Sequence, residues 1–310
     1  RRNCLRWDWS APARHENNNC VLPLLDSWIR KVNPDQAQGG RYWNNYTWHG
    51  DQDPSQPWWN GTQNCDVDLS DMRFTKLNTS WGKNFVENKM PEAHWKLESI
   101  ERGARLVVIT PEYNPTASRA DYWIPVRPET DGTLFLGASK IILDENYQDM
   151  DFIKGFTDMP LLVRTDTLQY LDPFEVVKDY QLPDFSKSYS GRMQGLNPDQ
   201  IRRLGGMMVW DLAKGKAVPL HREQVGMHLA QSGIDPALTG TYRIKLLNGR
   251  EVDAIPIYQM YQIHLQDYDL DTVHQVNRAP KDLVVRWARD CGTVKPAAIH
   301  NVEGVCHYFH

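Results

Sequence analysis

Cysteine is scarce in this 310-residue sequence, and none of the five cysteines belongs to a C-x-x-C pair. So few scattered cysteines cannot form a disulfide scaffold, and their spacing fits neither a zinc site nor an iron–sulfur cluster. The glycine-rich phosphate-binding motifs G-x-x-x-x-G-K-S/T and G-x-G-x-x-G are also missing. The sequence therefore lacks the usual fingerprints of mononucleotide-binding and nicotinamide-binding proteins.

Long apolar runs and runs of charge of one sign are lacking too. No stretch approaches the roughly 20 apolar residues that span a bilayer, so we expect no transmembrane segment. The 35 basic and 39 acidic residues are interspersed, and a net charge of −4 favours neither a nucleic-acid groove nor a polybasic membrane patch. The start has no methionine and no apolar targeting segment, and the end is apolar and aromatic. We therefore expect an internal fragment of a longer protein.

Apolar residues make up 41% of the chain, enough to bury the core of one large domain or two medium ones. Nine of the twelve tryptophans lie before residue 100, in a stretch rich in Asn, Gly and Pro, which indicates aromatic packing under long loops. The same stretch contains Asp51 and Asp53. Two carboxylates among tryptophans are also compatible with a sugar-binding module or a glycosidase, and Asp51 alone with a metal ligand.

From about residue 80 the pattern predicts alternating strands and helices. A helix is expected at Glu92–Arg102, a buried strand at Leu106–Thr110, a second strand at Tyr122–Val126 and a helix from Thr130 through Leu143. Such alternation is typical of an α/β fold with a mainly parallel sheet flanked by helices.

The last third of the chain contains the strongest turn signal. Asn248-Gly249 separates two alternating runs within residues 241–255, which predicts an inserted β-hairpin. After it we expect helices at residues 257–265 and 280–290, with a helix cap at 271–273 between them, and a strand from residue 297.

Polar residues follow two of the predicted strands, where an open α/β sheet binds its ligands. Glu112, after the strand at 106–110, can accept hydrogen bonds from ribose hydroxyls, and Asp131 can accept both N–H groups of a guanine edge. The alternatives are a solvated turn residue and a helix cap. Lys83 and Asn84 can reach phosphate oxygens from the loop at Gly82, although a glycine before a lysine is by itself an ordinary turn.

Taken in order, these segments resemble the molybdopterin oxidoreductases of the dimethyl sulfoxide reductase superfamily. The stretch Y-T-W-H-G-D at 46–51 is similar to the segment that brings an aspartate to molybdenum in the nitrate reductase branch. W-G-K-N at 81–84 and P-E-A-H at 91–94 resemble that branch's W-G-x-N and P-D-A-H segments. Residues 107–113, 120–125 and 127–131 resemble the strand, turn and helix start that hold one guanosine of the cofactor. From Trp48 through Asp131 the chain looks most like nitrite oxidoreductases.

Two positions depart from the family pattern. Glu112 stands where the broader family usually has Asp, which preserves the carboxylate. Glu129 stands where the family usually has Gly, which we expect to alter the turn before Asp131.

The resemblance implies roles for particular residues. It makes Asp51 the molybdenum ligand and places His49 beside it as a second catalytic candidate. It implies that the cofactor is held by Trp81, Gly82, Lys83, Asn84, Thr110, Pro111, Glu112 and Asp131, with Gly304 and His307 near the pterin.

The resemblance also implies a domain division. Residues 1–60 are expected to form a loop-rich segment leading to the molybdenum ligand, and residues 61–290 the α/β guanosine- and pterin-binding domain with its hairpin near 241–255. Residues 291–310 are expected to begin a further cofactor-binding domain.

The implied activity is oxidation of nitrite to nitrate at a molybdenum bis(molybdopterin guanine dinucleotide), with oxygen from water and two electrons passed to iron–sulfur clusters. A 4Fe-4S cluster in a preceding segment, an iron–sulfur beta subunit and a haem-binding gamma subunit are implied as well. We expect a bacterial protein on the periplasmic or intracytoplasmic side of a membrane, attached through its partners. A related nitrate, chlorate or perchlorate reductase and a hydrocarbon dehydrogenase remain alternatives.

Overall fold

The computed structural model describes residues 69–88, 90–184, 198–221 and 233–301. All of them except Leu69 belong to a compact unit that begins at Ser70. Within these ranges no helix is both long and apolar enough to cross a bilayer.

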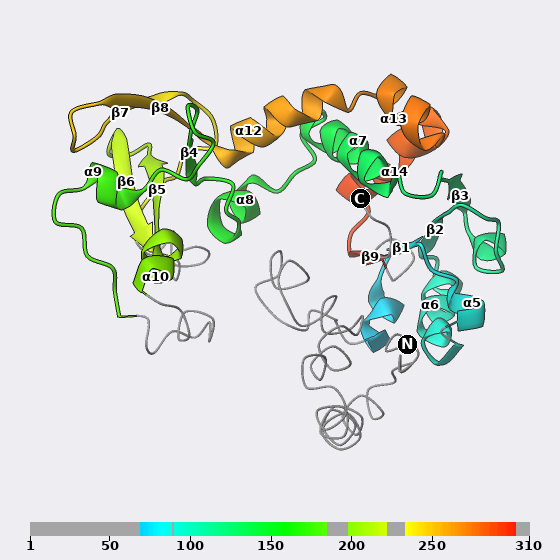
Figure 1. Cartoon of the computed structure of the whole chain (residues 1–310). Coiled ribbons are helices and arrows are strands. Elements are labelled where there is room, and N and C mark those ends of the chain that lie inside the picture. Colours follow the sequence, from blue (N-terminus) through cyan, green and yellow to red (C-terminus); the bar gives the residue numbers. More distant parts are fainter. Residues whose placement is uncertain (1–68, 89, 185–197, 222–232, 302–310) are drawn as a thin grey trace, which may run out of the picture. The chain divides into compact units, whose positions relative to one another are not determined.

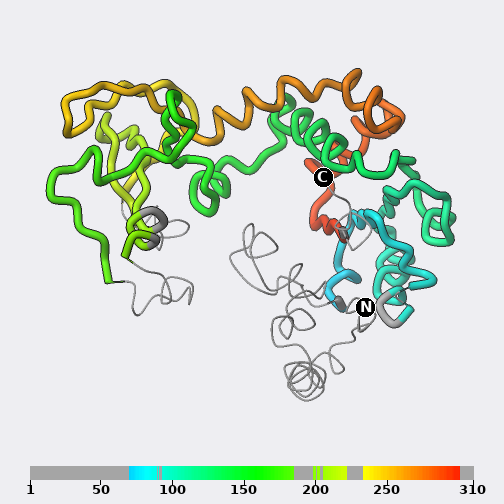
Figure 2. Tube along the Cα trace, viewed as in Figure 1, coloured from blue at the N-terminus to red at the C-terminus, as the bar shows by residue number. Residues whose placement is uncertain are grey.

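The main sheet has four parallel strands in the order β3-β2-β1-β9 (Figure 1). These strands are β1 (Leu77–Trp81), β2 (Arg105–Thr110), β3 (Tyr122–Pro125) and β9 (Ala297–Asn301). The strand β9, from the last part of the chain, lies beside β1, with Ala297 in register with Leu77 (Figure 2). The strands predicted at 106–110, at 122–126 and from residue 297 are confirmed.

Helices cover both faces of this sheet. Successive side chains of β2 point to opposite faces and pack into two different apolar clusters, one on each face. Leu106 and Val108 pack with Ile100 of α6, whereas Val107 and Ile109 belong to a larger cluster with residues of α7, α13 and α14. The helical elements near this sheet are η5 (Leu69–Phe74), α5 (Phe85–Asn88), α6 (Met90–Glu101), η6 (Ala117–Arg119), α7 (Asp131–Asp144), α13 (Leu270–Asn277) and α14 (Lys281–Thr293). The predicted α/β fold with a parallel sheet flanked by helices is confirmed.

Buried polar contacts fasten α14 to the sheet. The indole N–H of Trp287 donates to the Thr79 hydroxyl at 3.0 Å, and Asp290 accepts a hydrogen bond from the Tyr122 hydroxyl at 2.7 Å. Asp290 also pairs with Arg105, so α14 is tied to β1, β2 and β3 at once.

The predicted helices are present, with one correction. Those expected at 92–102, 130–143, 257–265 and 280–290 correspond to α6, α7, α12 (Ile257–His264) and α14. The cap expected at 271–273 is wrong, because these residues lie inside α13. Asp269 caps that helix instead, by accepting the backbone N–H of Thr272 at 2.7 Å.

Two antiparallel sheets interrupt the parallel one in sequence, between β3 and β9. One has the order β4-β8-β7 and the other pairs β5 with β6. The elements of this region are α8 (Met150–Phe156), β4 (Leu162–Arg164), α9 (Pro173–Val176), α10 (Pro198–Gly205), β5 (Gly206–Asp211), β6 (Lys216–His221), β7 (Tyr242–Lys245), β8 (Glu251–Pro256), α12 and η9 (Leu265–Asp267).

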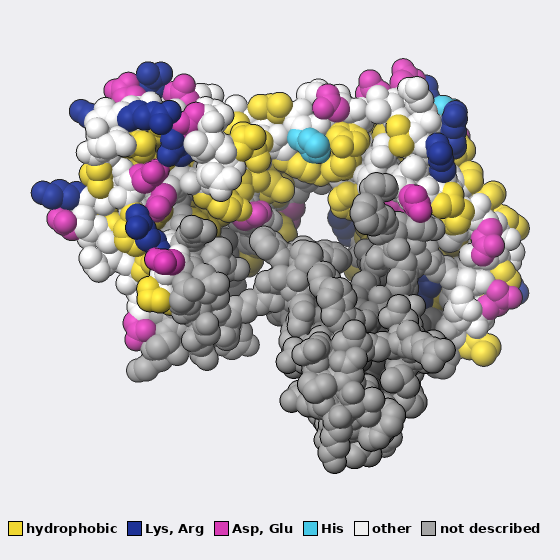
Figure 3. Space-filling model, in the orientation of Figure 1, with side chains coloured by type: hydrophobic (Ala, Val, Ile, Leu, Met, Phe, Trp, Pro, Cys, Tyr) yellow, Lys and Arg dark blue, Asp and Glu magenta, His cyan; other side chains and the backbone are white. Residues whose placement is uncertain are grey.

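The hairpin predicted within 241–255 is confirmed as β7 and β8, with Gly249 in the left-handed conformation at φ 85°. Charged side chains of both signs are intermixed on its surface (Figure 3). Arg243 lies 3.0 Å from Glu251, and Arg250 lies 2.8 Å from Asp166. These pairs are exposed, so they contribute little stability each.

Candidate functional site

The predicted cofactor residues lie at the carboxyl edge of the parallel sheet. Gly82 follows β1 directly, and its φ of 62° is a conformation that favours glycine. Its backbone N–H donates to the carbonyl of Ile109 at 2.9 Å, which brings the end of β1 against the end of β2. Thr110 ends β2, and Asp131 begins α7 after the turn that follows β3.

A cavity of about 190 Å³ opens at this edge. Seven of the eight described residues that were predicted to hold the cofactor line it: Gly82, Lys83, Asn84, Thr110, Pro111, Glu112 and Asp131. The sequence analysis did not single out the other lining residues, which are Asn88, Ile109, Asn114, Val126 and Pro128. Segments separated by as many as 49 positions, from Gly82 to Asp131, therefore meet in one place.

Trp81, the eighth predicted residue, is buried beneath the cavity and does not line it. Its indole N–H donates to Oδ1 of Asp131 at 2.6 Å. The indole ring also packs edge-on against Trp287, with 5.3 Å between ring centroids. Trp81 thus orients the Asp131 carboxylate from below, while Oδ2 and the second lone pair of Oδ1 stay available to a ligand.

The loop after β2 is fixed by hydrogen bonds of its own residues. The Thr110 hydroxyl donates to the carbonyl of Glu112 at 2.7 Å, and the Trp123 indole N–H donates to the carbonyl of Thr110 at 3.0 Å. The side chain of Glu112 itself is exposed. This arrangement holds the loop backbone while it leaves the Glu112 carboxylate for a ligand.

Asn84 is committed to a structural contact. Its side-chain carbonyl accepts the Thr116 hydroxyl at 2.8 Å, and its amide donates to Glu87. The same Thr116 hydroxyl accepts the backbone N–H of Val86 at 3.2 Å. Asn84 therefore joins the loop after β1 to the segment before η6, and Lys83 next to it lines the cavity.

The turn before Asp131 is held from a distant part of the chain. The Asn277 side-chain amide, fully buried at the end of α13, donates to the Thr130 carbonyl at 3.0 Å and to the Thr130 hydroxyl at 2.9 Å. Arg127 donates its backbone N–H to the Asn277 carbonyl at 2.8 Å. Within this turn Glu129 has φ 70°, in the left-handed region that glycine adopts more readily than other residues.

A cationic cluster lies at the same sheet edge, around the buried ring of Phe85. The ammonium groups of Lys96 and Lys83 lie 3.5 and 4.2 Å from its centroid, and the His300 ring meets it edge-on at 5.6 Å. Burial, helped by the charges of Lys96 and Lys83, lowers the pKa of His300 to about 3. His300 is therefore neutral at physiological pH.

Four predicted residues lie outside the described residues: Asp51, His49, Gly304 and His307. Their roles stay predictions. In the part of the chain that is described, no group of three or more His, Cys, Asp or Glu side chains could hold a metal ion.

Comparison with known proteins adds the family. The family model for molybdopterin oxidoreductases matches residues 36–286, most of the chain and all of the cavity lining. The chain belongs to the molybdopterin oxidoreductase family. This family is named after the molybdopterin cofactor, which carries molybdenum.

Individual relatives in the molybdopterin oxidoreductase family are similar at modest identity. The perchlorate reductase alpha subunit of Dechloromonas aromatica is 27% identical over 86% of this chain and 29% of its own length. The respiratory nitrate reductase alpha subunit of Haloferax mediterranei is 28% identical over 86% of this chain and 26% of its length. The chlorate reductase alpha subunit of Ideonella dechloratans is 32% identical over 57% of this chain and 17% of its own length. The chain thus spans less than a third of these relatives.

Among solved structures, acetylene hydratase from Pelobacter acetylenicus matches 76% of this chain and 20% of its own, at 14% identity and a TM-score of 0.38. A TM-score this low supports no further conclusion.

The residues at the carboxyl edge fit a polar part of a molybdopterin cofactor. Carboxylates, a threonine and asparagines can meet a base and a ribose, and Lys83 can meet a phosphate. The cavity is smaller than the roughly 300–1,000 Å³ of pockets for drug-sized ligands, so it fits part of a cofactor rather than a whole one.

Proposed function

We propose that this chain is the cofactor-holding part of the catalytic subunit of a molybdenum oxidoreductase that oxidises nitrite to nitrate. The observation that best supports cofactor binding is the cavity at the carboxyl edge, lined by seven residues that the sequence analysis singled out. Nitrite as the substrate is supported by the resemblance of residues 48–131 to nitrite oxidoreductases. Residues scattered over a turn, a helix start and two loops would not converge there by chance in a sugar-binding module.

In this proposal the residues of this chain bind the cofactor and orient it. Asp131, held by Trp81, accepts the two N–H groups of a guanine, and Glu112 accepts hydrogen bonds from the ribose. Lys83 neutralises a phosphate oxygen, with Gly82 allowing its close approach. When bound, the cofactor supplies the two-electron chemistry of molybdenum.

Asp51 is proposed as the molybdenum ligand and His49 as its catalytic neighbour, with Gly304 and His307 near the pterin. The proposal includes the guanine dinucleotide form of the cofactor and transfer of electrons to iron–sulfur clusters, one of them a 4Fe-4S cluster in the catalytic subunit. It also includes an iron–sulfur beta subunit, a haem-binding gamma subunit, and attachment through them to the periplasmic or intracytoplasmic side of a bacterial membrane.

A reducing activity is the main alternative. It is favoured by the names of the relatives, which are reductases of perchlorate, nitrate and chlorate. Fold and cofactor are the same in both cases, and direction depends on redox potentials rather than on the cavity described above. The glycosidase hypothesis depended on Asp51 and Asp53, and family membership does not support it.

Cofactor binding is tested by Asp131→Asn. An amide offers only one acceptor oxygen to the guanine edge, so we expect the affinity for a guanine dinucleotide cofactor to fall by about tenfold to a hundredfold. Asp144→Asn, at the other end of α7, is the matched control and should retain the cofactor. Guanine content after gel filtration gives the measurement, and equal retention in both variants would refute the assignment of Asp131.

Catalysis and direction need a separate experiment. In the assembled enzyme, Asp51→Ala should abolish nitrite oxidation while guanine content stays at the wild-type value. Wild-type rates of nitrite oxidation with a dye acceptor and of nitrate, chlorate and perchlorate reduction with a low-potential donor decide the direction. A faster reduction of any of these oxyanions would favour the alternative.

A further inference from the structure

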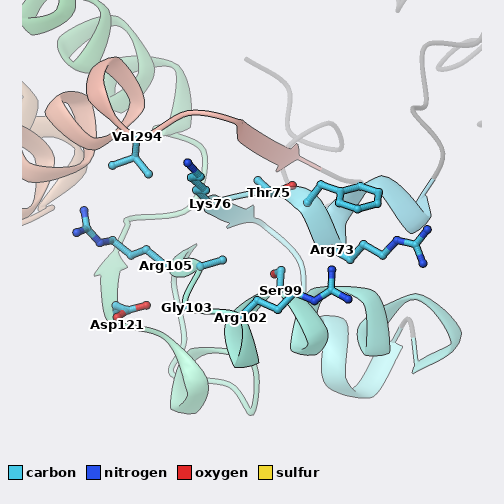
Figure 4. A pocket seen from close by; sticks show the side chains of 11 residues that line it. Arg73, Thr75, Lys76, Ser99, Arg102, Gly103, Arg105, Asp121 and Val294 are labelled. Carbon is cyan, nitrogen blue, oxygen red and sulfur yellow. The ribbon is translucent and has the colours of Figure 1, made fainter.

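A larger cavity, about 650 Å³, lies at the opposite, amino edge of the parallel sheet (Figure 4). Residues just before or at the start of three strands line it, namely Lys76 before β1, Arg105 in β2 and Asp121 before β3. The rest of the wall comes mainly from η5 and from the end of α6. No residue of the proposed cofactor site belongs to this cavity, which we call the amino-edge pocket.

The lining of the amino-edge pocket is strongly basic. Four cationic side chains, Arg73, Lys76, Arg102 and Arg105, face a single acidic one, Asp121. Four positive charges minus one negative charge leave a formal charge of +3. One carboxylate oxygen of Asp121 also accepts the backbone N–H of Leu106 at 2.7 Å, so it is partly engaged with the sheet.

Two of the four cations have partners. Arg105, which lines the pocket, pairs with Asp290, and Asp290 also accepts the Tyr122 hydroxyl. Arg102 pairs with Glu98 one helical turn earlier, but the two side chains are 54% and 30% exposed. An exposed pair of this kind is weak, so Arg102 can exchange Glu98 for a stronger anion.

The other two cations, Lys76 and Arg73, have N–H groups that can donate hydrogen bonds to a ligand. Within the described residues, the exposed ammonium of Lys76 takes part in no hydrogen bond or ion pair, although its backbone N–H donates to the carbonyl of Pro296. The Arg73 guanidinium lies 4.7 Å from the ring centroid of Phe74 and 5.2 Å from that of Trp95. These rings hold the guanidinium without neutralising it, and its buried Nε has no acceptor among the described residues.

We propose that the amino-edge pocket binds a small polyanion with at least two phosphate or carboxylate groups. Arg73 and Arg102 extend along one side of the pocket and Lys76 lies on the other, so two anionic groups of one molecule meet separate cations (Figure 4). A volume of about 650 Å³ falls within the roughly 300–1,000 Å³ of small-molecule sites. Guanidinium groups bind both kinds of anion through paired N–H donors.

The test measures binding to the intact, cofactor-loaded protein, so that the cofactor already fills the carboxyl edge. Pyrophosphate and citrate are titrated separately by calorimetry and by thermal unfolding, each against sodium chloride of equal ionic strength. We expect saturable binding and a rise of about 2 °C or more in Tm near saturation. Binding of pyrophosphate alone indicates a phosphate ligand, and binding of both indicates that carboxylates suffice; either result supports the pocket.

The variant Lys76→Glu tests whether the polyanion binds in the amino-edge pocket. Because the Lys76 side chain is exposed, this substitution should leave the fold intact and weaken polyanion binding by about tenfold or more. Lys216→Glu, an exposed lysine at the start of β6, is the control with the same charge change and should not affect binding. Absence of saturable binding, an equal effect of both substitutions, or loss of binding in Lys83→Glu but not in Lys76→Glu would overturn the proposal.

Discussion

Asp131 begins α7 inside the cavity at the carboxyl edge, and Trp81 holds one of its oxygens from the buried side. Under the proposed function, a carboxylate fixed in this way does not have to lose side-chain freedom when a guanine binds, which favours affinity. The consequence is that a residue with no surface in the cavity controls how well the cavity works.

Trp81→Phe removes the indole N–H donor while a ring still fills the core. We expect a loss of about 1.5–3 kcal/mol in the free energy of unfolding, and a drop in cofactor affinity, because Oδ1 of Asp131 loses its partner. Chemical denaturation and guanine content give the two measurements. Tyr122→Phe is the control: it loses a comparable buried hydrogen bond to a carboxylate, that of Asp290, at the start of β3, and should lower stability without changing cofactor affinity.

Glu129 has a backbone conformation that glycine adopts more readily, at φ 70°. Glu129→Gly relieves that strain but increases the entropy of the unfolded chain, so we expect a net stabilisation of about 0.5–1 kcal/mol. Urea denaturation measures it. The same substitution inside α6, Glu98→Gly, should instead destabilise the protein by about 1 kcal/mol, and a similar loss at both positions would contradict the explanation.

At the scale of elements, the site depends on contacts between segments far apart in sequence. The start of α7 is fixed by α13, whose Asn277 holds the turn at residues 127–130. The end of β1 is fixed by Asn84, through Thr116 before η6. These two asparagines keep the loops at the carboxyl edge in place, as the supporting residues of a binding site must.

Asn277→Ala should therefore disorder the turn. We expect about 1–3 kcal/mol lower stability, because the carbonyl and the hydroxyl of Thr130 lose a buried donor, together with faster hydrogen exchange of the amides at 129–131. Val273→Ala removes buried volume where α13 packs against α7 and provides the comparison. It should lower stability to a similar extent without faster exchange confined to this turn.

Much of this arrangement could be predicted from local pattern. The buried run at 106–110, the Asn-Gly hairpin and the helix beginning at Asp131 each have a signal within a few residues. Other features could not be predicted. Pro219 lies in the middle of β6, where proline argues against a strand, and nothing near Asn277 in sequence points to a turn 147 residues earlier.

The candidate site likewise has some residues that the sequence could predict and others that depend on contacts between distant segments. Lys83, Glu112 and Asp131 were singled out because polar residues after parallel strands meet at one edge, and Thr110 was added by the family resemblance. Burial of Trp81 beneath Asp131 depends on packing against Trp287, and no spacing rule predicts that.

For the molecule as a whole, acid stability should depend on His300. Its pKa in the folded protein is about 3, against an ordinary value near 6.5, because burial and the charges of Lys96 and Lys83 oppose protonation. Below pH 6.5 His300 is protonated in the unfolded chain but stays neutral in the folded chain, so the free energy of unfolding falls as the pH falls. Above about pH 7 His300 is neutral in both states and has no effect on stability.

The loss attributable to His300 should approach about 1 kcal/mol per pH unit between pH 6 and 4. Denaturant titrations of wild type and His300→Gln over this range give it as the difference between two slopes, and the variant should lose stability less steeply. Parallel slopes for wild type and His300→Gln would exclude this role.

The place of β9 in the sheet has a consequence for synthesis on the ribosome. β1, β2 and β3 are complete by Pro125, but the neighbour of β1 on its other side begins only at Ala297, after both antiparallel sheets have been made. Until then β1 is an edge strand with unpaired backbone groups, exposed to mispairing. The nascent chain therefore has to protect that edge while residues 126–296 are made, and within the described residues the parallel sheet is complete only when β9 pairs with β1.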